Sequence, residues 1–204
     1  MPEIKAIIFD FGNVIATFDN NVFIQRISEY TEKSAEELTR LIYRESDLPR
    51  RFECGLMTDA EFYYAIRFLC LLDIPMDDFI RAYTEIFTPI EATNDLIAAL
   101  KKKGYKLGLL SNTSHMDFTF GIKRIPAFNY FCAVTTSFEV GAMKPSGRIY
   151  SDALRKIGEP AEACVYIDDI EEYVAAAEKL GLRGIHYIGH DNLMEDLKKI
   201  GVEI

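Results

Sequence analysis

The sequence predicts an α/β fold, in which a parallel β-sheet is covered by helices and an α-helical segment is inserted after the first strand. Three observations support this prediction. A short apolar run lies near the start of the 204-residue chain, and further runs alternate with helix-length stretches in its second half. Glycines follow several of those stretches, as they do at helix ends. Between about residues 20 and 88, apolar residues recur at helical spacing without a clear strand pattern.

The first strand is predicted within residues 5–14. Residues 6–9 are all apolar, and the run ends in Asp10, Gly12 and Asn13. An apolar run of this length is typical of a strand that is buried on both faces of a parallel sheet. Gly and Asn tolerate the tight backbone that follows such a strand. Asp10 is therefore expected at the carboxyl end of a buried strand, which is the edge where open α/β sheets bind ligands.

Residues 17–88 are predicted to form a helical cap between two parts of the core, residues 1–16 and 89–204. The spacing of apolar residues indicates four or five helices in this segment. Two capping boxes, Ser34–Glu37 and Thr58–Glu61, are expected at the starts of two of these helices. A helical insertion at the carboxyl edge of a sheet is well placed to act as a lid.

Strands and helices alternate again after residue 89. The predicted strands are residues 106–110, 131–135, 163–167 and 183–187. The predicted helices are residues 92–103, 147–157 and 171–180, each followed by glycine, and a last helix from residue 191. This order indicates right-handed crossover connections and a parallel sheet.

Composition and charge exclude several classes of protein. The chain is 49% hydrophobic, which is enough for a full core, and 27% charged. Its net charge is −9 and its basic residues are dispersed apart from residues 101–103, so we expect neither a nucleic acid nor an anionic membrane as a partner. No apolar run is long enough to cross a bilayer. Four widely spaced cysteines without metal-ligand spacing, and no signal-peptide pattern, predict a cytoplasmic protein. The chain is expected to be a monomer or a homodimer.

Polar residues follow three of the predicted strands, and a lysine precedes a predicted helix. These residues are Asp10, Ser111, Asn112, Asp168, Asp169 and Lys144. A carboxylate can attack phosphorus, and further carboxylates can hold Mg²⁺. A hydroxyl and main-chain N–H groups bind anionic oxygens, and a lysine neutralises the charge of the transition state. Each residue alone has an ordinary explanation as a turn, a helix cap or a surface charge, but their convergence at one sheet edge favours a phosphoryl-transfer site.

Four motifs resemble those of the haloacid dehalogenase (HAD) superfamily with a helical cap after the first strand. They are Phe9–Val14, Leu110–Asn112, Gly141–Pro145 and Tyr166–Asp169. The pattern Asp-x-Gly-Asn-Val followed by Ser-Asn-Thr is similar to the branch that contains bacterial α-glucose-1-phosphate phosphatase. The resemblance covers the whole chain. It implies a Rossmann-like core and a Mg²⁺-dependent phosphatase that hydrolyses a small phosphorylated metabolite, such as a sugar phosphate, through an aspartyl phosphate.

The resemblance also implies roles for individual residues. The expected catalytic residues are the nucleophile Asp10 and the phosphoryl-binding residues Ser111 and Lys144. The expected metal ligands are Asp10, the Gly12 carbonyl oxygen and Asp169, with Asp168 as an indirect or additional ligand. The expected substrate-binding residues are Asn112, Gly12, Asn13 and His115, the last of which starts a predicted helix at the same edge.

Position 12 departs from the pattern of the phosphatases in this superfamily. They usually carry a second Asp there, which protonates the leaving alcohol and then activates water, whereas this chain has Gly12. General acid catalysis typically contributes about 10²–10⁴-fold. We therefore expect a substrate with an acidic leaving group, or a proton supplied by a cap residue or by a substrate hydroxyl. Asp19 is expected to be a helix cap instead.

Two further positions bear on the site. In the cap, Arg50, Arg51 and Glu53 precede a loop that is expected to face the site. An arginine there is a candidate to touch substrate, although solvated surface is the commoner outcome for such residues. Tyr173 stands where the family often has Asn, and it is expected to be a partly buried helix residue.

Two other functions remain open from the sequence. In a 2-haloacid dehalogenase, Asp10 would displace halide from carbon, and that reaction needs no proton donor at position 12. It also needs no metal, whereas the paired acids Asp168 and Asp169 favour one. The second alternative is a catalytically idle phosphate-binding regulator that has lost the acid at position 12.

Overall fold

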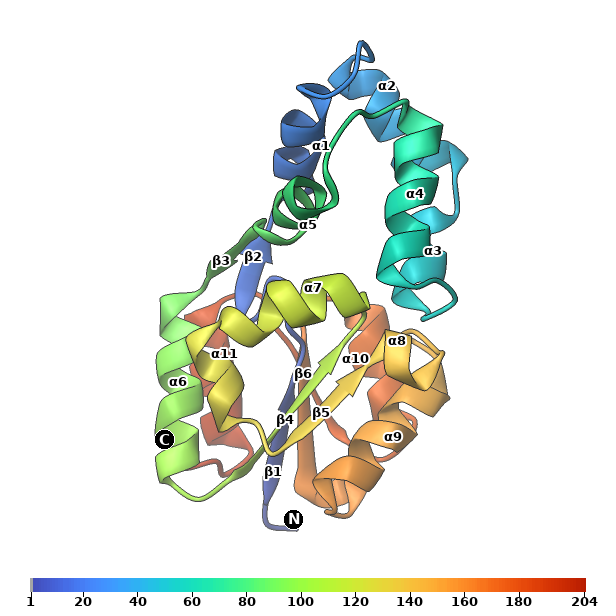
Figure 1. Cartoon of the computed structure of the whole chain (residues 1–204). Coiled ribbons are helices and arrows are strands. Elements are labelled where there is room, and N and C mark those ends of the chain that lie inside the picture. Colours follow the sequence, from blue (N-terminus) through green and yellow to red (C-terminus); the bar gives the residue numbers. More distant parts are fainter. Residues whose placement is uncertain (1) are drawn as a thin grey trace.

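The computed structural model describes residues 2–204 and has an α/β core with a helical cap over one edge of its sheet (Figure 1). The five strands of the core sheet are parallel and have the order β5-β4-β1-β6-β7. Their bounds are β1 (Ala6–Phe9), β4 (Lys106–Ser111), β5 (Ala133–Thr136), β6 (Cys164–Asp168) and β7 (Arg183–His186). The predicted parallel sheet is confirmed. Because β1 lies between β4 and β6, the carboxyl ends of these three strands meet at the middle of one edge.

Helices cover both faces of the sheet (Figure 1). One face packs against α6 (Glu91–Lys102) and α11 (His190–Lys199), and the other against α9 (Gly147–Ile157) and α10 (Glu171–Glu178). Side chains of β1 alternate between these two layers, with Ile7 and Phe9 in one and Ala6 and Ile8 in the other. All four side chains are fully or almost fully buried, which is why the strand reads as one uninterrupted apolar run.

The remaining core elements are short and lie in the connections between strands. They are α7 (His115–Phe120), α8 (Ser137–Val140) and the 3₁₀ helices η2 (Ile122–Arg124), η3 (Pro126–Tyr130) and η4 (Ala161–Ala163). In Figure 1, α7 runs between the sheet and the cap, and α8 lies just below the lower end of the cap helix α3. These two helices therefore form the surface on which the cap rests.

An antiparallel ribbon connects the core to the cap. It consists of β2 (Ala16–Phe18) and β3 (Phe87–Pro89), with Phe18 paired to Phe87. The sequence did not predict this ribbon, and β3 begins within a region where no strand was expected. Strands of three residues are too short to show the period-two pattern by which a strand is recognised.

The cap between these two strands is helical, as predicted. Its elements are α1 (Asn20–Ser28), α2 (Ala35–Thr39), a π-helical turn η1 (Arg40–Glu45), α3 (Leu48–Glu53), α4 (Asp59–Cys70) and α5 (Met76–Thr84). Both predicted capping boxes are present, at the starts of α2 and α4. The helices enclose a separate aromatic core that includes Phe23, Phe52, Phe62 and Phe79. Met116 of α7 is buried in the same cluster, so the cap and the core share apolar packing.

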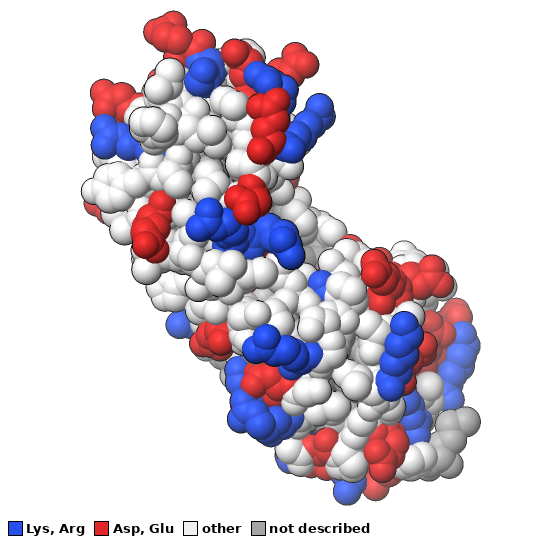
Figure 2. Space-filling view, turned by 90° about the vertical axis from the view of Figure 1, so that its right-hand side faces the viewer, with Lys and Arg blue, Asp and Glu red and all other residues white. Residues whose placement is uncertain are grey.

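Charged residues are mixed over the surface. On the face shown in Figure 2, Lys and Arg are interspersed with Asp and Glu along both the cap and the core. This distribution agrees with the dispersed basic residues of the sequence. Within residues 2–204, no helix combines the length and the apolar character that a membrane span requires.

The capping box at the start of α4 provides a test of how the cap is stabilised. The Thr58 hydroxyl accepts the Glu61 N–H at 3.2 Å, and the Glu61 carboxylate accepts the Thr58 N–H at 2.8 Å. We expect Thr58→Ala to lower the free energy of unfolding by about 1 kcal/mol, because it leaves a helix N–H without its partner. For a chain of this size, that change lowers the Tm by about 2–4 °C.

Thermal unfolding followed by circular dichroism measures this effect. Thr39→Ala is the matched control, because its hydroxyl bonds only to the Ala35 carbonyl within helix α2. We expect the control to keep the Tm of the wild type. Equal changes in the two variants would contradict the capping argument.

Candidate active site

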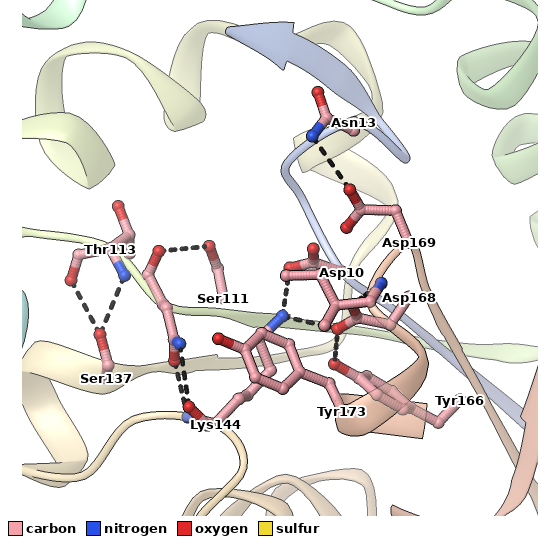
Figure 3. A network of polar contacts seen from close by, with 12 residues as sticks. Asp10, Asn13, Ser111, Thr113, Ser137, Lys144, Tyr166, Asp168, Asp169 and Tyr173 are labelled. Atoms are coloured by element: carbon pink, nitrogen blue, oxygen red, sulfur yellow. Dashed lines mark hydrogen bonds and ion pairs between the residues drawn. The ribbon is translucent and has the colours of Figure 1, made fainter. Parts of the chain in front are cut away.

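A cavity of about 290 Å³ lies between the carboxyl edge of the sheet and the cap. Asp10, at the end of β1, and Ser111, at the end of β4, line this cavity. Lys144, before α9, and Asp169, after β6, line it as well. The structure thus brings together four strand-end and loop residues that are far apart in the sequence, and Figure 3 shows them around one space.

Lys144 connects two of the acids. Its ammonium nitrogen lies 2.6 Å from Asp10 Oδ1 and 2.7 Å from Asp168 Oδ2 (Figure 3). The side chain is 4% exposed, which is unusual for a lysine. Burial alone would lower the pKa of Lys144, but the two carboxylates outweigh it, so the net pKa is raised and the ammonium stays charged.

Asp10 is buried beside one positively charged neighbour, Lys144. Burial raises the pKa of the Asp10 carboxyl to about 7, against the opposing effect of Lys144. Asp168 adds to the rise, because a second negative charge disfavours ionisation. The ion pair with Lys144 is therefore what favours the carboxylate form of Asp10, which is the form that can act as a nucleophile.

Asp168 has partners for both of its oxygens. Oδ2 accepts from Lys144 and from the Tyr166 hydroxyl, and Oδ1 accepts the Ile170 N–H at 2.9 Å. The residue is fully buried and does not line the cavity. Asp168 is thus placed to hold Lys144 beside Asp10.

Asp169 points toward the cavity instead. Its Oδ2 accepts from Asn13 Nδ2 at 3.0 Å (Figure 3). Asn13 adopts a left-handed backbone with φ 54°, a conformation that Asn tolerates better than most residues. This turn places its amide against Asp169, so one of the residues expected to bind substrate also orients an expected metal ligand.

The three acids fit a divalent cation. One oxygen from each of Asp10, Asp168 and Asp169 lies within 4.8 Å of the others. Carboxylate oxygens are the ligands that hard cations such as Mg²⁺ prefer. Three carboxylates and the single ammonium of Lys144 leave two negative charges at the site, which a divalent ion would balance.

Ser111 ends β4, Asn112 follows it, and both residues line the cavity, but their side chains have different partners. Ser111 is almost fully buried. Asn112 accepts the Lys144 N–H through Oδ1 at 2.8 Å and reaches the Lys144 carbonyl through Nδ2 at 3.3 Å. The amide of Asn112 is thus occupied with the main chain, and it fixes the loop that carries the buried lysine.

His115 does not lie with the other expected residues. It does not line the cavity, and its side chain is 54% exposed. Its Nδ1 contacts Asp59 Oδ2 of the cap at 2.8 Å. The structure thus places His115 at a contact between core and cap, and the expectation that it binds substrate has no support in its position.

Gly12 lines the cavity, and the ring of Phe18 stands beside it. A Cβ built at position 12 would lie 3.1 Å from Phe18 Cε1. That separation is tighter than ordinary van der Waals contact. A side chain at this position would therefore require the Phe18 ring to shift by a few tenths of an ångström.

The cap contributes a polar wall, of which the sequence had indicated only Glu53, as part of a segment expected to face the site. Tyr43, Glu53 and Tyr83 line the cavity, together with Asp117 of α7, whereas Arg50 and Arg51 do not. Burial raises the pKa of the Glu53 carboxyl to about 7. Burial also raises the pKa of Asp117 to about 8, with a contribution from Glu53.

Ser137, which the sequence did not single out, connects this wall to the loop after β4. The Ser137 hydroxyl accepts the Thr113 N–H at 2.9 Å and donates to the main-chain oxygen of Glu53 at 2.6 Å. Ser137 directly follows β5. A polar residue at the carboxyl end of a predicted strand is the pattern that could have indicated Ser137 as a residue near the site. Tyr173 is half-buried as expected, and its ring centre lies 5.0 Å from the Lys144 ammonium.

Comparisons with known proteins identify the family of this chain. The profile of the haloacid dehalogenase-like hydrolase family matches residues 4–181. A glyceraldehyde 3-phosphate phosphatase of Methanothermobacter thermautotrophicus is 28% identical over 89% of this chain and 84% of the relative. An (S)-2-haloacid dehalogenase of Pseudomonas putida is 26% identical over 89% of this chain and 83% of the relative.

Solved structures share the fold. A HAD family enzyme of Bacteroides thetaiotaomicron, crystallised with magnesium and inorganic phosphate, superposes with a TM-score of 0.74. It is 24% identical, and the match covers 89% of this chain and 93% of that enzyme. Because the family profile spans most of the sequence and the fold agrees over nearly its whole length, the chain belongs to the haloacid dehalogenase-like hydrolase family.

Proposed function

We propose that this hydrolase is a Mg²⁺-dependent phosphatase that cleaves a small phosphorylated metabolite through an aspartyl phosphate on Asp10. The observation that carries the proposal is the buried Asp10 carboxylate, paired with Lys144 at 2.6 Å beside two further acids. Two comparisons support it. A relative of similar length is a phosphatase, and a protein with the same fold was crystallised with magnesium and inorganic phosphate.

In the proposed reaction, Asp10 attacks phosphorus in line and the bond to the leaving oxygen breaks. Lys144 neutralises charge on the phosphoryl oxygens, and the Ser111 hydroxyl donates to them. Water then attacks phosphorus and releases Asp10 and inorganic phosphate. Asp10, Asp169 and the Gly12 carbonyl oxygen would hold Mg²⁺, with Asp168 as an indirect or additional ligand. The metal ion would supply further charge neutralisation at the phosphoryl group.

The cavity limits the substrate. Its volume of about 290 Å³ under the cap suits a small metabolite rather than a protein side chain. Lys144 is the one Lys or Arg that lines it within residues 2–204. A second phosphate or a carboxylate on the substrate would therefore lack a cationic partner, which favours an uncharged, hydroxylated group such as a sugar.

A haloacid dehalogenase is the second candidate. The observation that favours it is Gly12, because displacement of halide from carbon needs no proton donor there. A dehalogenase is also among the relatives that cover most of this chain. The clustered acids argue against it, since carbon displacement by a carboxylate gains nothing from a divalent cation.

A screen of phosphorylated metabolites tests the proposed function. We expect Mg²⁺-dependent release of inorganic phosphate, highest for sugar and polyol phosphates. Asp10→Asn should lower turnover by more than about 10³-fold, because it removes the nucleophile. Asp191→Asn, an exposed position at the start of α11, is the matched control and should keep wild-type activity.

The same screen separates the alternatives. Halide release from a 2-haloacid that persists with a chelator would replace the proposal with the dehalogenase function. Binding of inorganic phosphate without turnover of any ester would instead indicate an idle regulator. Phosphate release at an equal rate with and without Mg²⁺ would overturn the metal dependence.

Metal binding has a test that does not depend on activity. A ligand that binds only the folded state at 100 times its Kd adds about 2.7 kcal/mol to the free energy of unfolding. We therefore expect saturating Mg²⁺ to raise the Tm of the wild type by several degrees, and Asp169→Asn to abolish most of that rise. Differential scanning calorimetry with and without Mg²⁺ or Ca²⁺ measures this rise in Tm. A Tm that neither ion changes, in the wild type as in Asp169→Asn, would contradict the proposed metal site.

A further inference from the structure

The proposed reaction needs a proton that position 12 cannot supply. Cleavage of an alkyl phosphate leaves an alkoxide unless an acid protonates the leaving oxygen. Gly12 has no side chain, and the ring of Phe18 lies 3.1 Å from the place of a Cβ. The proton must therefore come from another group that reaches the same cavity.

Four carboxylic acids line the cavity: Asp10, Asp169, Glu53 and Asp117. Asp10 is the proposed nucleophile, and Asp169 belongs to the acid cluster that would hold the metal. Asp117 is fixed at the start of α7. Its Oδ2 accepts from the Ser114 hydroxyl at 2.9 Å, and its N–H donates to the Ser114 hydroxyl oxygen. The other oxygen of Asp117, Oδ1, is buried without a partner within residues 2–204. Glu53 is the one of the four acids that the cap contributes.

The Glu53 carboxyl is free to interact with a substrate. Within residues 2–204, no hydrogen bond or ion pair to this carboxyl is present, and Glu53 is held through its main-chain oxygen. That oxygen accepts from Ser137, which also accepts the N–H of Thr113, two residues after Ser111. The same hydroxyl thus fixes Glu53 relative to the loop that would bind the phosphoryl group.

The loop after Glu53 packs closely on the core as well. A Cβ at Gly55 would lie 2.1 Å from the Phe138 carbonyl oxygen, so only glycine permits this approach. Its φ of 70° also favours glycine. The end of α3 therefore packs tightly against α8.

The surroundings of Glu53 favour its protonated form near neutral pH. Burial raises the pKa of its carboxyl to about 7. The titratable groups around it are the hydroxyls of Tyr43 and Tyr83 and the carboxyl of Asp117, none of which is a cation. Arg50 and Arg51 of the same helix do not line the cavity.

We infer that Glu53 is the general acid and base of the reaction, in place of the missing side chain at position 12. As Asp10 Oδ forms its bond to phosphorus, the bond to the leaving oxygen breaks, and that oxygen takes the proton of Glu53 and departs as an alcohol. The Glu53 carboxylate then takes a proton from the water that attacks phosphorus. The bond to Asp10 breaks, and Glu53 is again protonated. This role rests on the proposed phosphatase function.

The test compares leaving groups in Glu53→Gln, which keeps the size of the side chain and its main-chain contact. The value of kcat/KM reports only steps up to departure of the leaving group. For an alkyl phosphate such as a sugar 6-phosphate, we expect kcat/KM to fall by about 10²–10⁴-fold. For p-nitrophenyl phosphate, whose leaving group needs no proton, we expect a fall of less than about tenfold.

The pH dependence gives a second measurement on the wild type alone. A general acid must be protonated, so kcat/KM for the alkyl ester should fall as the pH rises through the Glu53 pKa of about 7. The aryl ester should lack this decrease, so the ratio of alkyl to aryl kcat/KM should fall over this range; ionisation of Asp10, whose pKa is also about 7, affects both esters alike and cancels in the ratio. Glu32→Gln, the same change at an exposed cap position, should match the wild type with both substrates.

The outcomes distinguish this inference from the proposed function. An equal fall for aryl and alkyl esters in Glu53→Gln, or an alkyl pH profile without the decrease, overturns the role of Glu53 and leaves the phosphatase standing. A selective fall in Asp117→Asn with none in Glu53→Gln also overturns it and assigns the acid to Asp117. Failure of the wild type to hydrolyse any phosphate ester overturns the phosphatase and this inference together.

Discussion

The site depends on one buried ammonium. Lys144 lies between Asp10 and Asp168 at 2.6 and 2.7 Å, and without it two carboxylates would face each other in an almost dry environment. Removing one partner of a buried ion pair typically costs about 3–5 kcal/mol, because the remaining charge is left without compensation. Asn112 and Tyr166 reinforce the arrangement, the first by fixing the Lys144 main chain and the second by donating to Asp168. The residues expected to perform chemistry are thus also responsible for holding this edge of the sheet together.

Much of the core could be predicted because its rules are local. A parallel strand buried on both faces is an apolar run, a helix end carries glycine, and the carboxyl ends of neighbouring strands meet at one edge. These rules were enough to expect Asp10, Ser111, Lys144 and Asp169 at one site. They also located the helices of the cap, since capping boxes and helical spacing are readable over a few residues.

The features that the sequence did not reveal arise from long-range packing. The β2–β3 ribbon pairs residues about 70 positions apart, and each strand is too short to show a pattern. The sequence also does not show in which direction a polar side chain points. His115 and Asn112 are both polar residues at the right edge, yet one contacts the cap and the other the Lys144 main chain. Tyr43, Glu53 and Tyr83 reach the cavity through the packing of the cap on the core, and the raised pKa of the Glu53 carboxyl follows from that burial.

The shared packing at Met116 has a consequence for how substrates reach the cavity. Met116 belongs to α7 of the core, but its side chain is buried among the apolar residues of the cap. A cap that swung away as a rigid body would expose this methionine to water, which costs about 1.5–3 kcal/mol for a side chain of this size. Sliding of the cap helices over α7 would keep the contact intact. A swing of the cap as a rigid body therefore carries this cost each time the cavity opens, whereas a shear movement of the cap helices over α7 would avoid it.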